Sequence, residues 1–379
     1  MALLDGDVIL TMIAQAAPHT PKYRATSNPE LDSSVVSTSL SLNTKATISN
    51  AFWGCRSSVN RQLNATSIDL EPYWRYYTNQ CDRALHDGGQ HIATRTHRDV
   101  VDTVSKLKAG VLRTDLKSDL KSNLTSSHAN EDELLENSVN LAATLLLMTS
   151  FGSYSYGYSG RSLLQWTDGT LRDFVHGYFA PVADPLSIHD NIRLEKNFNA
   201  LNLGRIAGLE IVWTDNIADH LRLADHDTRV HVFHHASFLE YQRQSRESLL
   251  PEGLAEETLQ TLALLFPSSD LETKEWFAKL PFFQSLDRRV IQCDKIKTND
   301  RKIETFKFWR ARLISLKQVF DEAQPKTLVQ WWFDRRDGVQ WYTFWVAVLV
   351  LVLTVFFGLV QSIEGGIQVY ASLKALHNE

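Results

Sequence analysis

The longest apolar run of the chain lies close to its C-terminus. From Trp341 to Val360 the twenty residues WYTFWVAVLVLVLTVFFGLV contain no charged side chain. At 1.5 Å per residue, a helix of this length spans about 30 Å, the thickness of a bilayer hydrocarbon core. Because a helix of a soluble domain is seldom apolar on every face for five turns, the pattern predicts a transmembrane helix over residues 341–362.

The residues around this run predict how it sits in a membrane. Aromatic and basic side chains favour the bilayer interface. We expect the following residues to anchor the segment there: Trp331, Trp332, Arg335, Arg336, Trp341, Tyr342 and Trp345. The charges that follow the run are Glu364, Lys374 and Glu379, so the basic excess lies before it. The positive-inside rule therefore predicts a cytosolic N-terminal domain.

The position of the run predicts how it reaches the membrane. Nineteen residues follow Val360, so the segment is still inside the ribosome when synthesis ends. We expect insertion after translation, as in tail-anchored proteins. The nearly neutral tail and the strongly apolar segment favour the endoplasmic reticulum or a connected endomembrane.

The N-terminus contains a segment that competes with this interpretation as a targeting signal. Residues 9–14 are mostly apolar, but Asp5 and Asp7 precede them and no basic residue does. A secretory signal peptide needs a basic start and a longer apolar run. If this segment did act as a signal, the topology would invert, and the sequons at Asn64 and Asn123 could carry glycans.

The rest of the chain divides by composition. Residues 1–50 include a stretch rich in Ser and Thr, which predicts a poorly ordered arm. Residues 51–323 predict a mainly helical globular domain, with a possible subdivision near residues 181–190. A juxtamembrane link over 324–340 leads into the membrane segment, and residues 363–379 form a short tail.

Apolar positions with helical spacing recur through the globular part. Together with capping signals they predict helices that begin after Asn130 and Thr167, and further helices over 194–206, 216–221, 253–266, 270–279 and 301–323. Two short stretches, 209–213 and 230–233, are rich in β-branched and aromatic residues and predict strands. The expected fold class is mainly α, an α+β fold with a minor strand component, plus the C-terminal transmembrane helix.

Composition narrows the function classes. The net charge of −5, from 39 basic and 44 acidic residues, argues against a protein that grips nucleic-acid phosphates, so we expect no nucleic-acid partner. Hydrophobic residues make up 44%, which allows a packed core and excludes wholesale disorder. Cys55, Cys81 and Cys293 are odd in number and widely spaced, which supports neither a disulfide scaffold nor a cysteine-based zinc module.

The densest polar cluster lies between residues 219 and 235, where five of the 13 histidines fall within sixteen residues. Histidine and carboxylate side chains are the ligands of many divalent metal centres. The candidate ligands are His220, His226, Asp227, His231 and His235. Their spacing fits no standard ligand template, so two interpretations stay open: a metal site, or a polar loop whose histidines bond locally around a strand.

Other motifs for catalysis are incomplete. Gly157-Tyr158-Ser159-Gly160 resembles a nucleophile elbow, but the pattern needs a glycine where Arg161 stands. The sequence contains no phosphate-binding loop and no dinucleotide fingerprint. We therefore expect no cofactor, with a divalent metal as the alternative, and the catalytic residues stay unknown.

Several stretches together resemble a group of filamentous-fungal proteins. They are IVWTDNIADHL at 211–221, VFHHASFL at 232–239, residues 249–267 and the anchor at 334–354. The resemblance covers about residues 130–370. It implies a fungal source and a membrane anchor, and it assigns no catalytic residue.

Two functions follow from these patterns. The first is a single-pass, tail-anchored interaction or accessory module on the cytosolic face, with the lipid bilayer and a protein as partners; this interpretation leans away from an enzyme. The alternative is a membrane-tethered, metal-dependent hydrolase or accessory enzyme of fungal secondary metabolism, which would use the cluster at 219–235.

Overall fold

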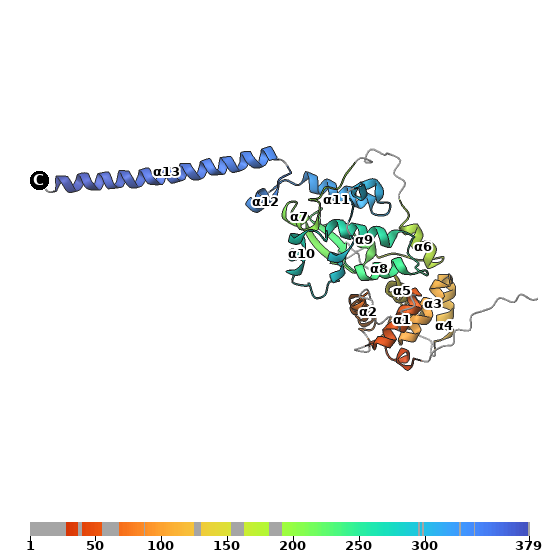
Figure 1. Cartoon of the computed structure of the whole chain (residues 1–379). Helices are drawn as coiled ribbons and strands as arrows, with labels where there is room; N and C mark the ends of the chain where they lie inside the picture. Colours follow the sequence, from red (N-terminus) through yellow and green to blue (C-terminus); the bar gives the residue numbers. More distant parts are fainter. Residues whose placement is uncertain are drawn as a thin grey trace, which may run out of the picture.

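The computed structural model describes residues 28–36, 40–54, 68–86, 88–124, 130–152, 163–181, 192–294, 296–297, 299–325, 327–336 and 338–377. Over these residues the chain forms thirteen α-helices, short 3₁₀ turns and one three-stranded sheet. The predicted fold class, mainly α with a minor strand component, is confirmed. Figure 1 shows a body of packed helices from which one long helix, α13 (Gly338–Leu376), projects.

Five helices form the N-terminal end of the body (Figure 1). They are α1 (Leu42–Trp53), α2 (Glu71–Ala84), α3 (His97–Lys108), α4 (Arg113–Ser122) and α5 (Glu131–Leu147), preceded by the 3₁₀ turn η1 (Pro29–Asp32). The central helix is α5, since α2, α3 and α4 all pack against it. Its predicted start is confirmed, with Asn130 as the N-cap. A capping box of Thr96 and Asp99 fixes the start of α3.

Part of the segment expected to be a poorly ordered arm is folded. Residues 1–27 and 37–39 lie outside the described residues, whereas α1 is a helix with a buried Phe52. The hydroxyl groups that suggested disorder have structural partners. The Ser41 hydroxyl accepts the N–H of Thr44 at 3.2 Å, and Thr44 itself is buried. The prediction is wrong for this helix, because its Ser and Thr residues serve as a cap and as buried side chains.

The second half of the body surrounds the small sheet. Its helices are α6 (Leu171–Tyr178), α7 (Ala200–Arg205), α8 (Ala236–Gln244), α9 (Leu254–Leu265), α10 (Leu271–Ala278) and α11 (Arg310–Glu322), with 3₁₀ turns η3 (Ile217–Asp219), η4 (Arg288–Gln292), η5 (Asn299–Arg301) and η6 (Ile303–Thr305). The strand order is β1 (Glu210–Thr214), β3 (Arg229–Phe233), β2 (Leu223–Ala224). Strand β1 runs parallel to β3, and β2 runs antiparallel to it. Both predicted strands are confirmed as β1 and β3.

One predicted helix starts later than its apolar pattern suggested. The helix expected from residue 301 begins only at Arg310, as α11. The buried carboxylate of Glu257, on α9, accepts the N–H groups of Lys307, Phe308 and Trp309, each at 2.8 Å. These backbone groups are therefore satisfied by a side chain fifty residues away, and a helical turn is not needed to pair them.

Two further helices differ from the prediction at their starts. The helix expected from residue 194 is restricted to α7, because the Asn199 side chain accepts the N–H of Asn202 at 2.8 Å and caps it there. Upstream, the Leu194 N–H is bonded to the carbonyl of Arg301 at 2.8 Å. Helix α6 is capped by Thr170 rather than by Thr167. Side-chain caps thus set boundaries that apolar periodicity alone leaves open.

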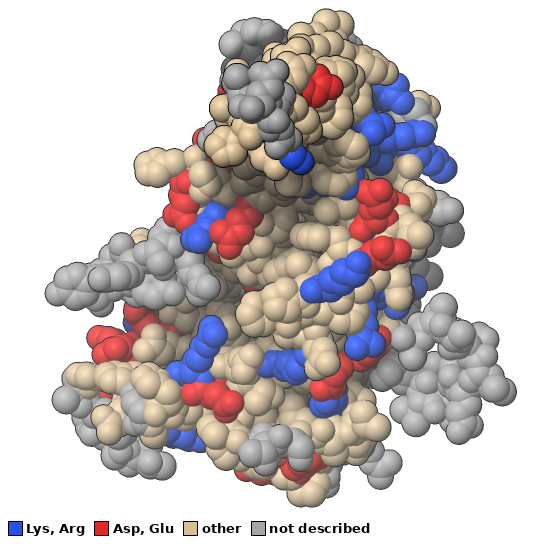
Figure 2. Space-filling view, turned by 90° about the vertical axis from the view of Figure 1, so that its left-hand side faces the viewer, with Lys and Arg blue, Asp and Glu red and all other residues tan. Residues whose placement is uncertain are grey.

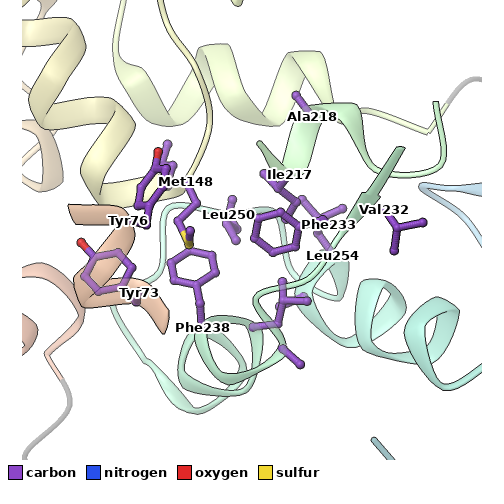
Figure 3. Close-up of a cluster of buried hydrophobic side chains, with 14 of the residues drawn as sticks. Tyr73, Tyr76, Met148, Ile217, Ala218, Val232, Phe233, Phe238, Leu250 and Leu254 are labelled. Carbon is purple, nitrogen blue, oxygen red and sulfur yellow. The ribbon is translucent and has the colours of Figure 1, made fainter. Parts of the chain in front are cut away.

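One hydrophobic core joins the two halves of the body. Figure 3 shows Tyr73 and Tyr76 of α2, Met148 after α5, Phe233 of β3 and Phe238 of α8 gathered together. The rings of Tyr73 and Phe238 stack with centroids 6.1 Å apart. The possible subdivision near 181–190 falls almost entirely outside the described residues.

The juxtamembrane link and the predicted membrane segment are also helical. The link contains α12 (Leu328–Phe333), and α13 then runs well past the expected end at residue 362. Over residues 338–374 this helix is long and apolar enough to cross a membrane, and its most apolar window has no buried residue. The presence of one candidate membrane span is thus confirmed.

The aromatic junction at Phe238 predicts a large loss of stability on truncation. Phe238→Ala removes a fully buried ring between the two halves and should lower the free energy of unfolding by about 3–5 kcal/mol. Thermal unfolding of the full-length protein in detergent micelles, followed by tryptophan fluorescence, measures the change. Leu42→Ala, on a side chain that is 84% exposed, is the control. Equal losses in the two variants would contradict this account of the core.

Candidate functional site

The sheet brings together residues that are nineteen to twenty positions apart. Since β1 and β3 are parallel, their carboxyl ends meet at the same edge, and Thr214 lies beside Phe233. The next residue after β1 is Asp215, and the next two after β3 are His234 and His235. The pairing register therefore places one carboxylate against two imidazoles.

The three side chains form a compact group. The Oδ1 atom of Asp215 lies 2.7 Å from Nε2 of His235 and 3.2 Å from Nε2 of His234. The two rings stack with centroids 4.0 Å apart. Among the described residues, these three supply the ligand atoms of His, Cys, Asp or Glu that converge within 4.8 Å of one another. We call this group the Asp215 cluster.

The cluster has a buried side and an open side. Both histidine side chains are buried, whereas the Asp215 side chain is 49% exposed. The ring of His235 meets that of Tyr76 edge to face at 5.9 Å. On the other ring, Nδ1 of His234 accepts the backbone N–H of Asp287 at 3.3 Å. His234 is therefore the Nε2–H tautomer, and its Nε2 donates to Asp215.

Burial and hydrogen bonding set the charges in this group. Desolvation alone would raise the pKa of Asp215, but the hydrogen bonds from His234 and His235 outweigh it and hold that pKa well below its ordinary value. Burial, helped by the neighbouring His234, lowers the pKa of His235 to about 4. At neutral pH the cluster thus holds an ionised carboxylate and a neutral His235.

The distances between the donor atoms of the cluster fit a metal ion, but the partners of the two Nδ1 atoms do not. Donor atoms bound to one ion at about 2.1 Å lie roughly 3 Å from one another, as the two Asp215 contacts do. A metal-bound histidine, however, usually donates its second ring N–H to an acceptor. Nδ1 of His234 instead receives an N–H, and Nδ1 of His235 is buried without a partner. In this structure the three side chains form hydrogen bonds that join the end of β1 to the end of β3.

Two of the predicted metal ligands lie in a turn. His226 and Asp227, with Asp225, connect β2 to β3, and all three have positive φ values between 51° and 61°. Asp and His tolerate this left-handed conformation better than most residues. All three are exposed. Their residue types are explained by the geometry of a tight hairpin.

His220 has a structural environment. It is fully buried, its Nδ1 accepts the Phe233 N–H at 3.2 Å, and its Nε2 lies 2.7 Å from the Thr261 hydroxyl. That hydroxyl in turn donates to the carbonyl of Thr258 at 2.7 Å. Burial, with a contribution from Arg312, lowers the pKa of His220 to about 3. Both ring nitrogens are satisfied by a neutral imidazole.

Of the five predicted ligands, only His235 belongs to the Asp215 cluster. His231 lies on β3 beside Val212 and is half-buried. The prediction missed Asp215 and His234. The sequence signal that could have found them is their position directly after the two predicted strands, once those strands are paired in parallel. A metal-binding role for the predicted set stays a prediction.

The remaining chemical candidates give no second site among the described residues. Cys81 and Cys293 are buried, and burial raises the pKa of each thiol to about 12, so neither is a thiolate at neutral pH. Cys55 and residues 157–160 lie outside the described residues.

The predicted anchor residues lie at the junction of α12 and α13. Trp331 stacks on Phe344 with centroids 4.4 Å apart, and Trp332 meets Trp345 edge to face at 5.1 Å. Aromatic contacts thus join the short helix to the first turns of the long one.

The basic anchor residues have partners within the chain. The guanidinium of Arg335 lies over the ring of Trp341, which in turn meets Tyr342 edge to face. Arg336 pairs with Asp334 at 2.8 Å and bonds to the Ala323 carbonyl at 2.5 Å. Arg336 therefore fastens α12 to the end of α11.

Comparisons with family models, curated proteins and solved structures find no match for this chain.

The low pKa of His220 predicts acid sensitivity. The unfolded chain takes up protons below a pH of about 6.5, whereas folded His220 stays neutral down to about pH 3. Stability should therefore fall as the pH falls through this window. His220→Gln should lower stability at pH 7 by about 1–3 kcal/mol. It should also reduce the slope by up to about 1.4 kcal/mol per pH unit.

Unfolding of the full-length protein in detergent between pH 7 and pH 5 measures both effects. The control is His226→Asn, in the exposed turn, which should lower the stability at pH 7 less than His220→Gln does. An unchanged slope in His220→Gln would show that other groups cause the acid sensitivity.

Proposed function

We propose that this protein is a single-pass, tail-anchored membrane protein whose helical body acts as an interaction or accessory module. The proposal rests on α13, which projects away from the body (Figure 1) and exposes apolar side chains on all sides. In water such a surface would aggregate, and a bilayer is the solvent that it fits. The bilayer is the first partner, and a protein is the second.

In this proposal the helical body lies in the cytosol. Arg335 and Arg336 precede the span, and the excess of basic residues on this side supports a cytosolic N-terminal domain. The membrane proposed is the endoplasmic reticulum or a connected endomembrane. The fungal source implied by the resemblance belongs to the same proposal.

The described side chains support binding rather than catalysis. His220 completes a chain of hydrogen bonds in the core, and Cys81 and Cys293 are buried thiols. The Asp215 cluster closes the edge of the sheet. Since each of these groups has a structural task, we infer that the body presents a surface to a partner.

Membrane extraction tests the anchor. Deletion of residues 337–379 should move the protein from carbonate-washed membranes to the soluble fraction, because the apolar helix is then lost. Leu351→Arg combined with Val352→Arg should have the same effect, since each charge costs about 2.5–3.5 kcal/mol at the centre of a membrane helix. Leu42→Arg, on an exposed residue of the body, is the control.

A glycosylation gel tests the orientation in the same experiment. With a cytosolic body, Asn64 and Asn123 stay unmodified, and a sequon introduced after residue 376 is glycosylated. Retention of the deleted chain in washed membranes would contradict the anchor. Glycans on Asn64 or Asn123 would contradict the topology.

A metal-dependent enzyme is the second candidate, favoured by the convergence of Asp215, His234 and His235. Metal analysis of the purified full-length protein separates the two. From the outer contacts of both rings we expect far less than one zinc, manganese or iron ion per chain. A stoichiometric ion that is lost in Asp215→Asn and kept in Asp227→Asn would replace the first proposal by the second. The exposed Asp227 is the matched control.

A further inference from the structure

Two large apolar side chains stand out on the surface of the body. Leu271, the first residue of α10, is 68% exposed, and Phe282, in the turn after α10, is 70% exposed. Neighbouring aromatic residues show that exposure is not general here, since Phe277 is fully buried. We call Leu271 and Phe282 the α10 surface. Each such side chain gains free energy when a contact removes it from water, so we take these two positions, one at each end of α10, as a candidate contact site.

The α10 surface lies on the side of the body from which α13 leaves. Figure 1 shows α7, α10 and α12 together on that side. Helix α7 packs against both α10 and α12. The exposed Leu42, by contrast, lies on α1 at the far end of the body (Figure 1).

One side chain links α10 to the juxtamembrane helix. Arg205 of α7 pairs with Glu272 of α10 at 2.7 Å, and its guanidinium lies over the ring of Phe333 of α12 at 4.4 Å. The same residue therefore contacts the helix that carries Leu271 and the helix that leads into the membrane span. These contacts connect α10 to α12 through Arg205.

Helix α12 exposes apolar side chains of its own. Leu328 and Val329 are 66% and 62% exposed, and Trp332 is half-exposed. Since α12 directly precedes α13, these side chains lie at the level of the membrane interface if α13 spans the bilayer. Helix α7 lies between these side chains and α10, since it packs against both helices.

The charges on this face are mixed, since Glu272 and Glu275 of α10 are exposed as well as basic residues. Figure 2 views the body from the side of α13, and basic and acidic side chains are interspersed over the face. Lys279 is exposed near the end of α10, and Arg288 lies over the ring of Phe283 at 5.1 Å. Because both signs are present, shallow insertion of apolar side chains is the contribution that would hold this face to a bilayer.

We propose that the α10 surface is a second membrane contact, which lays the body against the bilayer beside the anchor. Phe282 and Leu271 then enter the boundary between headgroups and acyl chains, together with the exposed residues of α12. The body then has one fixed orientation, with α10 and α12 on the side of the membrane and α1 away from it (Figure 1). This inference rests on the proposed membrane anchor.

Depth-dependent quenching tests the contact in the full-length protein reconstituted into phosphatidylcholine vesicles. A single cysteine replaces Ser285, which is exposed and whose N–H bonds to the Phe282 carbonyl at 2.9 Å, and it carries an environment-sensitive fluorophore. Cys55→Ser removes one native thiol, and the buried Cys81 and Cys293 resist labelling. Matched cysteines at Leu42 and Leu351 mark the far end of the body and the span.

A lipid with a nitroxide near its headgroup should quench the fluorophore at Ser285 at least about twofold more than that at Leu42. Adding Phe282→Asp should bring the Ser285 signal down to the Leu42 level, and Leu42→Asp should leave the Ser285 signal unchanged. Because Phe282 is exposed, these variants keep the fold. Equal quenching at Ser285 and Leu42, or no response to Phe282→Asp, would overturn the inference.

The fluorophore at Leu351 separates this inference from the anchor. A lipid with a nitroxide deep in its acyl chain should quench it whether or not the α10 surface touches the bilayer. Deep quenching at Leu351 without shallow quenching at Ser285 leaves the anchor intact and removes the second contact. Absence of quenching at Leu351 contradicts the anchor itself.

Discussion

The constraint on which the rest depends is that the described body leaves the apolar faces of α13 uncovered beyond its first turns, where Trp331 and Trp332 of α12 pack. A helix pairs its own backbone N–H and C=O groups, so a long uncharged helical segment is stable in hydrocarbon. The same helix in water would expose side chains such as Leu351 and Phe356 on every face. The exposed apolar surface of α13 therefore makes this helix a candidate membrane anchor for the body.

Features encoded locally could be predicted from the sequence. The uncharged run predicts α13, and the β-branched stretches predict β1 and β3. Boundaries set by distant side chains could not be predicted. Glu257 caps the chain before Trp309 from another helix, which a periodic pattern does not register. Helix α1 was missed because Ser41 and Thr44 have the composition of a disordered segment while acting as a cap and as buried packing.

The candidate site shows the same division. The density of His and Asp pointed to the region that contains the Asp215 cluster, but which of these residues come together depends on strand pairing. A parallel register brings Asp215 to His234 and His235, and the hairpin sends His226 and Asp227 to the outside. Neither outcome can be obtained by counting spacings along one chain, because the relevant spacing runs across the sheet.

The partners of the basic residues bear on how the body meets a membrane. Sequence reasoning assigned Arg335 and Arg336 to lipid headgroups, yet Arg336 is paired with Asp334 and with carbonyls at the end of α11, and Arg335 lies over an aromatic ring. A guanidinium that is already paired gains less from a phosphate, because it must give up a partner to bind one. Arg336 thus joins the end of α11 to the segment after α12, whereas Arg335 packs on the first turn of α13, and a role of either at the membrane interface stays a prediction. In the proposed membrane contact, exposed apolar side chains such as Phe282 therefore contribute more than these paired charges.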